Sequence, residues 1–313
     1  MSITPQLDRY LSVRRSLGYD LRTEERRLRR FARFADQEGA PHIDTALFLR
    51  WDASLPAATT STRSARLSAV RLFAQWLSSI DPAHEVPPRG LLPDRSQRPR
   101  PHIYSEAEIA SIIAAAKALP SIYGLRGLTY STLFGLIAVT GLRISEALAL
   151  DHDDLDVENG VVRVRHGKLG KERLLPLDST VVAQLVGYSA ERDRLLGSAP
   201  DAFFVTCKGT RLTDCSARYN FAHACQQIGL RAHQHYCRHG RGPRIHDLRH
   251  TFAVRTMINW LRTGKDPARE MIRLTTYLGH TDPDNTFWYL EAVPELLDLA
   301  MATVTSNGGE ANQ

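Results

Sequence analysis

The sequence predicts a mainly α-helical protein with a small β-sheet, built as two domains. Apolar residues recur at helical spacing through most of the 313 residues, and strict period-two alternation is clear only between residues 161 and 177. A proline-rich stretch interrupts these patterns at residues 82–101. The length is enough for about two ordinary domains. We therefore expect a smaller N-terminal and a larger C-terminal domain.

The N-terminal domain is expected at residues 1–80 and contains helical patterns only. Apolar stripes run over residues 7–13 and 28–35, and shorter patterns follow at 45–51 and 61–77. Arginines cover most of the polar side of the second pattern. Four short helices can form a small domain around these apolar faces.

Residues 81–102 are expected to connect the domains. The stretch 82–101 holds six prolines with four arginines between them. Proline at this density prevents helix and favours an extended, semi-rigid connector. These arginines could contact a phosphate backbone, and they are equally consistent with an ordinary solvated connector.

The C-terminal domain is expected at residues 103–303, followed by a disordered tail at 304–313. It opens with a capping-box pattern from Ser105 to Glu108. An apolar helix follows, and then a hairpin whose strands cover 161–166 and 173–177. Further helical patterns are expected at residues 179–196, 212–229, 246–262, 266–277 and 293–303.

Composition excludes several protein classes. The chain is 43% hydrophobic and 24% charged, as soluble globular proteins are. Its longest uncharged stretch, residues 127–142, is too short for a membrane span. The first residues do not read as a signal peptide. The four cysteines form no CxxC pair, so we expect a cytoplasmic protein without a disulfide framework.

The positive charge is concentrated in the first third of the chain. Residues 1–100 contain 17 arginines and 11 acidic residues, whereas the rest is neutral, and the total is +6. A GC-rich genome would explain the preference for arginine over lysine but not this asymmetry. A basic module beside a neutral one indicates a polyanionic partner such as nucleic acid.

Two basic positions stand at turns of the second domain. Arg143 lies between two apolar helical patterns, and with Glu146 it also reads as an ordinary surface pair. Lys168 and Lys171 lie in the hairpin turn, in a chain with only five lysines and 35 arginines. Lysine can give up a proton and arginine effectively cannot, so Lys168 is a candidate general acid or part of a soluble turn.

Two further positions complete a pattern. His246 and Arg249 are spaced to project from one face of a helix. His280 follows in a Leu-Gly-His sequence, and Tyr289 comes nine residues later. Each residue alone is more often structural, but their joint order is hard to ascribe to chance.

This order, with TGLRISEALAL, GKLGKER, HDLRHTFA and LGH ahead of a tyrosine, resembles the tyrosine recombinase (phage integrase) family. The resemblance covers residues 103–291 and extends loosely over 1–80. It implies a helical core-binding (SAM-like) DNA-binding domain followed by a catalytic domain. The stretch from Arg249 to His280 is several residues longer than is usual in the family.

The resemblance also implies catalytic roles and partners. Tyr289 would attack DNA to form a 3′-phosphotyrosine, without metal, ATP or other cofactor. The supporting residues would be Arg143 and Arg249 on the phosphate oxygens, His280 as a hydrogen-bond donor to them, His246 as proton acceptor and Lys168 as proton donor. Expected partners are double-stranded recombination sites, a homo-tetramer passing through a Holliday junction, and accessory or sister recombinases.

Three other interpretations remain open at this point. A topoisomerase-like enzyme would use the same residues without two specific sites, and a non-catalytic DNA-binding protein would keep only the fold. A zinc site is also conceivable, although its spacing matches no known finger and a basic loop fits better. Its ligands would come from Cys225, His233, His235, Cys237 and His239.

Overall fold

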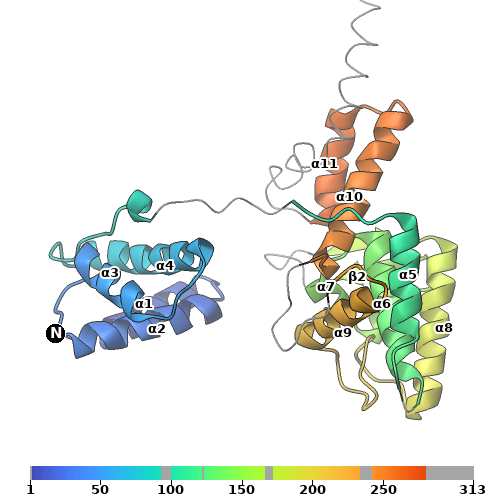
Figure 1. The fold of residues 1–313 in the computed structure, drawn as a ribbon, viewed down its shortest axis with the longest axis horizontal. Helices are drawn as coiled ribbons and strands as arrows, with labels where there is room; N and C mark the ends of the chain where they lie inside the picture. Colours follow the sequence, from blue (N-terminus) through green and yellow to red (C-terminus); the bar gives the residue numbers. More distant parts are fainter. Residues whose placement is uncertain (1, 93–99, 122, 166–171, 233–241, 280–313) are drawn as a thin grey trace, which may run out of the picture. The chain divides into compact units, whose positions relative to one another are not determined.

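The computed structural model describes residues 2–92, 100–121, 123–165, 172–232 and 242–279. These residues form mostly helices, with a three-stranded antiparallel sheet (Figure 1). The mainly helical fold class expected from the sequence is confirmed. The chain divides into two compact units, Met1–Pro99 and Arg100–Gln313.

The first unit is helical throughout. Its helices are α1 (Ile3–Ser16), α2 (Arg22–Gln37), α3 (Thr45–Ser54) and α4 (Thr60–Ser78), followed by the 3₁₀ turn η1 (Arg89–Leu91). They enclose a core in which Phe31 meets Trp51 edge to face, with the ring centroids 5.2 Å apart. Aromatic side chains bury large apolar areas, which allows so small a unit to hold a core.

A buried ion pair joins two helices of this unit. The Asp52 carboxylate on α3 accepts hydrogen bonds from Arg63 at 2.6 Å and Arg66 at 2.8 Å, both on α4. Burial favours the neutral acid, but the Arg66 and Arg63 hydrogen bonds hold the pKa of Asp52 below its ordinary value. The pair therefore fixes α3 against α4.

The residues after α4 pack against the first unit instead of leaving it at once. The Ile43 amide donates to His84 Nδ1 at 3.0 Å, and the Glu85 amide donates to the Ile43 carbonyl at 2.7 Å. Leu92 is buried in the same core. The first part of the connector expected at residues 81–102 therefore packs as part of the first unit, because His84 and Leu92 are buried there.

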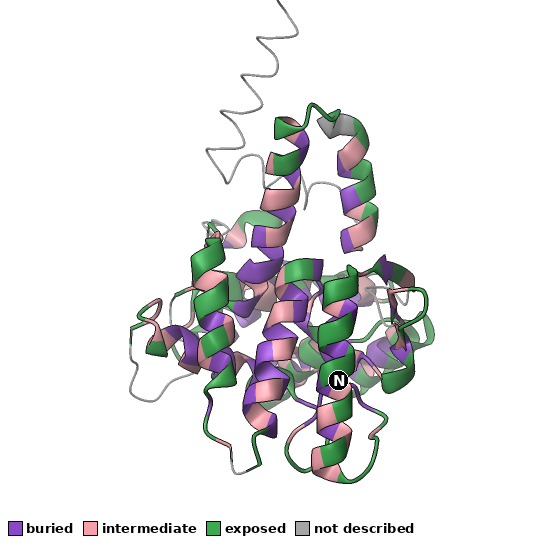
Figure 2. Ribbon diagram, turned by 90° about the vertical axis from the view of Figure 1, so that its right-hand side faces the viewer, coloured by how far each residue is buried: buried purple, intermediate pink, exposed green. Residues whose placement is uncertain are grey.

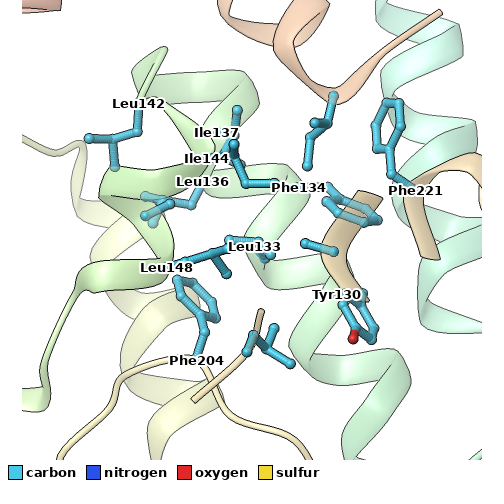
Figure 3. Close-up of a cluster of buried hydrophobic side chains, with 14 of the residues drawn as sticks. Tyr130, Leu133, Phe134, Leu136, Ile137, Leu142, Ile144, Leu148, Phe204 and Phe221 are labelled. Atoms are coloured by element: carbon cyan, nitrogen blue, oxygen red, sulfur yellow. The ribbon is translucent and has the colours of Figure 1, made fainter. Parts of the chain in front are cut away.

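The second unit is organised around one buried helix. Figure 3 shows α6 (Leu125–Thr140) contributing Tyr130, Leu133 and Phe134 to the central cluster. Phe221 stacks edge to face on Phe134, with the ring centroids 5.1 Å apart. The helices packed against α6 are α5 (Glu106–Lys117), α7 (Ile144–Ala149), α8 (Ser179–Leu196), α9 (Asp214–Gln227) and α10 (Ile245–Arg262).

The sheet has the order β1-β2-β3 and is antiparallel throughout. Its strands are β1 (Leu155–Asp156), β2 (Val161–Val164) and β3 (Arg173–Pro176), and the short turn η2 (His152–Asp154) precedes them. Val162 pairs with Leu175, and both are buried. β2 and β3 form at the positions where the sequence indicates a hairpin, whereas the two-residue β1 has no such signal.

Helix α11 (Pro267–Leu278) returns along α10 as a helical hairpin. Figure 2 shows buried stretches on both helices. The buried side chains of the two helices form a second apolar cluster, separate from the central one. Its members are Ala253, Val254, Met257, Trp260, Met271, Leu274 and Leu278. In the part of the chain described above, no helix combines the length and apolar character that a bilayer span requires.

Two glycines of α6 give a matched test of this packing. A Cβ on Gly127 would lie 2.2 Å from the Lys117 carbonyl oxygen, whereas a Cβ on Gly135 would lie 3.7 Å from Ile113 Cδ1. We expect Gly127→Ala to lower the free energy of unfolding by about 1–3 kcal/mol through overpacking against backbone. Gly135→Ala should leave it unchanged or raise it by up to about 1 kcal/mol, because alanine favours helix. Urea unfolding measures both, and equal responses would contradict the packing.

Candidate active site

Three consecutive carbonyls at the end of α11 each accept a hydrogen bond from an arginine. The carbonyls at a helix C-terminus lack intrahelical partners and carry partial negative charge, so they suit cationic donors. The bonds run from Arg173 Nε to Tyr277 at 2.9 Å, from Arg249 Nη2 to Leu278 at 2.7 Å, and from Arg143 Nη2 to Gly279 at 2.8 Å. They bring β3, α10 and the start of α7 to one point.

Gly279 makes this convergence possible. Its φ is +64°, a left-handed conformation that favours glycine at a helix end. A Cβ at this position would lie 3.0 Å from Arg173 Nη1 and 3.5 Å from Arg143 Nη1. A larger residue would therefore crowd the Arg173 guanidinium as well as strain the backbone.

Glu146 binds two of the arginines with one carboxylate. Its Oε1 accepts Arg143 Nη1 at 2.7 Å and Arg173 Nη1 at 3.1 Å, and its Oε2 accepts Arg173 Nη2 at 2.8 Å. The side chain is only 2% exposed, so the pair with Arg143 is buried and not on the surface. Burial opposes ionisation, but hydrogen bonds from Arg173 and the Arg143 amide hold the pKa of Glu146 below its ordinary value. Two cations facing one anion leave net positive charge.

Arg249 is buried in the second unit. Its Nη1 donates to the Gly141 carbonyl at 2.7 Å, while Nη2 donates to Leu278. Gly141 ends α6 with φ +63°, and a Cβ there would lie 2.6 Å from Phe252 Cδ1. Arg249 therefore links the ends of α6 and α11 from its position on α10.

His246 lies one helical turn before Arg249 and is half-buried. Its ring meets that of His250 edge to face, with the centroids 4.5 Å apart. Burial, together with the charge of Arg249, lowers the pKa of His246 to about 4. The imidazole is therefore neutral near pH 7 and can accept a proton.

The start of α10 is fixed by Asp247. This buried carboxylate accepts the Arg244 amide at 2.8 Å and Arg244 Nη2 at 3.0 Å. Such a capping arrangement satisfies an amide at the helix N-terminus. It sets the orientation of the first turn, from which His246 and Arg249 project.

Three of the six expected catalytic residues can be placed in this way. The structure brings Arg143 and Arg249 onto adjacent carbonyls, and both contribute to the lowered pKa of His246. The other three, Lys168, His280 and Tyr289, lie outside the described residues, as do the helix expected at 293–303 and the tail at 304–313.

Two members of the network had no role in the sequence-based assignment, namely Glu146 and Arg173. Both lie inside the quoted motifs TGLRISEALAL and GKLGKER. Within those motifs they look like exposed charges, and only their burial beside Arg143 reveals their contribution. The available signal was an acidic residue, Glu146, one turn after Arg143.

The alternative zinc site has one ligand among the described residues. Cys225 is fully buried in the central cluster, and burial raises the pKa of its thiol to about 12. His233, His235, Cys237 and His239 fall outside the described residues. Within the described ranges, no three histidine, cysteine, aspartate or glutamate side chains are grouped closely enough to hold a metal.

Comparison with known proteins identifies relatives of this chain. The phage integrase family model matches residues 103–295. The protein y4rB of Sinorhizobium fredii, whose name assigns it to integrases or recombinases, is 39% identical over 297 residues, covering 93% of each chain. Tyrosine recombinase XerD of Ralstonia nicotianae is 33% identical over 245 residues, covering 76% of this chain and 71% of its own.

The fold is also similar to that of a solved recombinase. The structure of XerH site-specific recombinase bound to palindromic difH substrate superposes with a TM-score of 0.66 and 19% identity, covering 90% of this chain and 79% of XerH. The family model covers well over half of the chain, and the relatives match most of its length. The chain therefore belongs to the phage integrase family, the tyrosine recombinases.

Proposed function

We propose that this chain is a site-specific recombinase that cleaves and rejoins double-stranded DNA through a 3′-phosphotyrosine at Tyr289. The observation that carries the proposal is the group of three arginines on the terminal carbonyls of α11, which retains positive charge beside a neutral histidine. Membership of the tyrosine recombinase family supports the reaction class.

The arginines suit the phosphate in the transition state. Arg143 donates from its side chain to Glu146 and Gly279, which uses two of its five N–H donors. Its other donors can bind non-bridging oxygens, and Arg249 on the neighbouring carbonyl adds a second positive charge. Because both guanidiniums are held in place before DNA arrives, little reorganisation is needed as negative charge develops.

The remaining residues would move protons. The Tyr289 oxygen attacks phosphorus and the bond to the 5′-oxygen breaks. Neutral His246 accepts the phenolic proton, Lys168 protonates the leaving 5′-oxygen, and His280 donates to a non-bridging oxygen. Attack by a 5′-hydroxyl reverses these steps and rejoins the strand. One phosphodiester replaces another, so the exchange needs no ATP or added cofactor.

The first unit would bind DNA through α2. A groove along this helix is lined by Arg22, Glu25, Arg26, Arg29, Arg30 and Arg33. Arg29 is held by Glu25 at 2.9 Å and Asp8 at 3.0 Å. Arg26 and Arg30 are exposed. Exposed arginines in a row along a helix match the charge of a phosphate backbone.

The assembly follows from the same class of reaction. Two recombination sites and four strand exchanges require four active sites, so we propose a homo-tetramer that passes through a Holliday junction. Residues 293–303 are the candidate segment for docking on a neighbouring protomer, and sister or accessory recombinases are further candidate partners. Action on chromosomal or mobile-element DNA would place the chain in the bacterial cytoplasm.

Covalent trapping tests the proposal. The wild type, Tyr289→Phe and Tyr219→Phe are incubated with fragmented DNA of the source bacterium, and protein–DNA adducts are isolated under denaturing conditions and sequenced. Tyr219 is exposed on α9 and serves as a matched phenol. We expect adducts from the wild type and Tyr219→Phe but not from Tyr289→Phe. Adducts from all three would show a different nucleophile, and none from the wild type despite DNA binding would favour the non-catalytic protein.

The state of His246 gives a second prediction. Its pKa is about 4, so its imidazole should stay neutral when the pH falls from 7 to 5 and become charged only below that. Since an unfolded histidine titrates near 6.5, this site should reduce the free energy of unfolding as pH falls from about 6.5 to 4. NMR titration of the ring proton, assigned by its loss in His246→Gln, measures the midpoint. A midpoint between 6 and 7 would contradict the lowering of the pKa of His246 by burial and by the charge of Arg249.

Binding by α2 gives a third prediction. Replacing Arg26 and Arg30 together by glutamine should weaken DNA binding and reduce the slope of log K against log salt by about 0.9 for each phosphate that the variant no longer neutralises. Arg50→Gln on α3 is the control, since Arg50 already faces Glu38 at 3.3 Å. Fluorescence anisotropy with a duplex between 50 and 200 mM salt measures the slopes. An unchanged slope in the double variant would show that DNA contacts another face.

A further inference from the structure

We propose that Arg173 is a positioning residue that aligns Arg143 for phosphate transfer, an inference that rests on the proposed function. Arg173 is the first residue of β3, and its side chain is 14% exposed. The transfer steps described above give it no part. Its position in the network nevertheless gives it influence over both side-chain contacts of Arg143.

The first contact is shared through Glu146. Arg173 donates to both oxygens of this carboxylate, at 3.1 Å from Nη1 and 2.8 Å from Nη2. The same carboxylate accepts Arg143 Nη1 at 2.7 Å and the Arg143 amide at 2.9 Å. A two-point contact fixes both position and tilt of a carboxylate. Arg173 therefore determines where Glu146 presents its oxygens to Arg143.

The second contact is shared through the end of α11. Arg173 Nε donates to the Tyr277 carbonyl at 2.9 Å, and the Gly279 carbonyl two residues later accepts Arg143 Nη2 at 2.8 Å. The Gly279 backbone also lies directly against Arg173, since a Cβ there would be 3.0 Å from Arg173 Nη1. Moving Arg173 would thus displace the carbonyl that holds the other side of Arg143.

Charge adds to this geometric role. With Arg173 present, the negative charge of Glu146 is divided between two guanidiniums. Without Arg173, the carboxylate would pair with Arg143 alone and would neutralise more of the positive charge with which Arg143 can bind the phosphate. Three of the five N–H groups of Arg173 point to protein acceptors, and its side chain is 14% exposed, so we assign its effect to the alignment of Arg143. Lysine cannot replace it, because a single ammonium cannot span Glu146 and Tyr277 with fixed planar geometry.

The test compares two substrates on the same protein preparation. Nicked duplexes carry the site recovered by covalent trapping, with either a normal phosphodiester or a methylphosphonate at the scissile position. The methylphosphonate has a methyl group in place of one non-bridging oxygen and is uncharged, so it gains less from an aligned guanidinium. The rate of covalent adduct formation is measured for wild type, Arg173→Lys and Arg143→Lys. Arg163→Lys, an exposed arginine on β2, is the matched control.

We expect Arg173→Lys to lower the ratio of phosphodiester to methylphosphonate rates by about tenfold or more, as Arg143→Lys does. DNA affinity should stay near that of the wild type, and the control should keep the wild-type ratio. Loss of folded protein lowers both rates equally and cancels in the ratio. An unchanged ratio in Arg173→Lys would overturn the inference in favour of a purely structural ion pair. No adduct from the wild type with either substrate would instead contradict the proposed function, and the inference with it.

Discussion

The architecture of the candidate active site depends on one set of hydrogen bonds, those between three arginines and the last carbonyls of α11. Arg143, Arg173 and Arg249 come from different elements and meet only because residues 277–279 offer successive acceptors. Burying a guanidinium is costly unless its N–H groups are satisfied, and the helix end supplies both acceptors and favourable charge. Without α11, each arginine would need another partner.

This dependence explains the helical hairpin that precedes the site. Helix α11 can offer its carbonyls at a fixed place only if it is itself held, and it packs against α10 through Trp260, Met271 and Leu274. His246 and Arg249 lie in the first two turns of the same helix α10. One helix pair therefore carries His246 and Arg249, which we propose as proton acceptor and phosphate ligand, together with the support for the other arginines. The site as a whole is positively charged, because its arginines outnumber the Glu146 carboxylate and His246 is neutral near pH 7.

Local periodicity accounts for what the sequence predicted well. The pattern at 179–196 coincides with α8, and that at 246–262 starts one residue after α10, because amphipathic spacing reflects which face is buried. The capping box of Ser105 and Glu108 forms as its residue types indicate. Arg143, His246 and Arg249 were recognised from motifs, and the structure brings them together.

Tertiary contacts account for what the sequence did not reveal. Backbone carbonyls at a helix end leave no residue signature, so the roles of Glu146 and Arg173 could not be read from spacing. Strand β1 is two residues long and forms only by pairing with β2. His84 and Leu92 pack into the first unit although the prolines around them indicate a free connector. Lys168, His280 and Tyr289 stay predictions from the motifs.

The central claim is that the arginines are held in place before DNA binds, and nitrogen-detected NMR of the guanidinium groups tests it most directly. In the DNA-free protein, Arg143, Arg173 and Arg249 should each give resolved Nη signals with slow rotation about the Cζ–Nε bond. Adding site DNA should shift Arg143 and Arg249 most. Rapidly averaged signals for all three, like those of an exposed arginine such as Arg26, would show that the site is assembled only on DNA and would contradict the account.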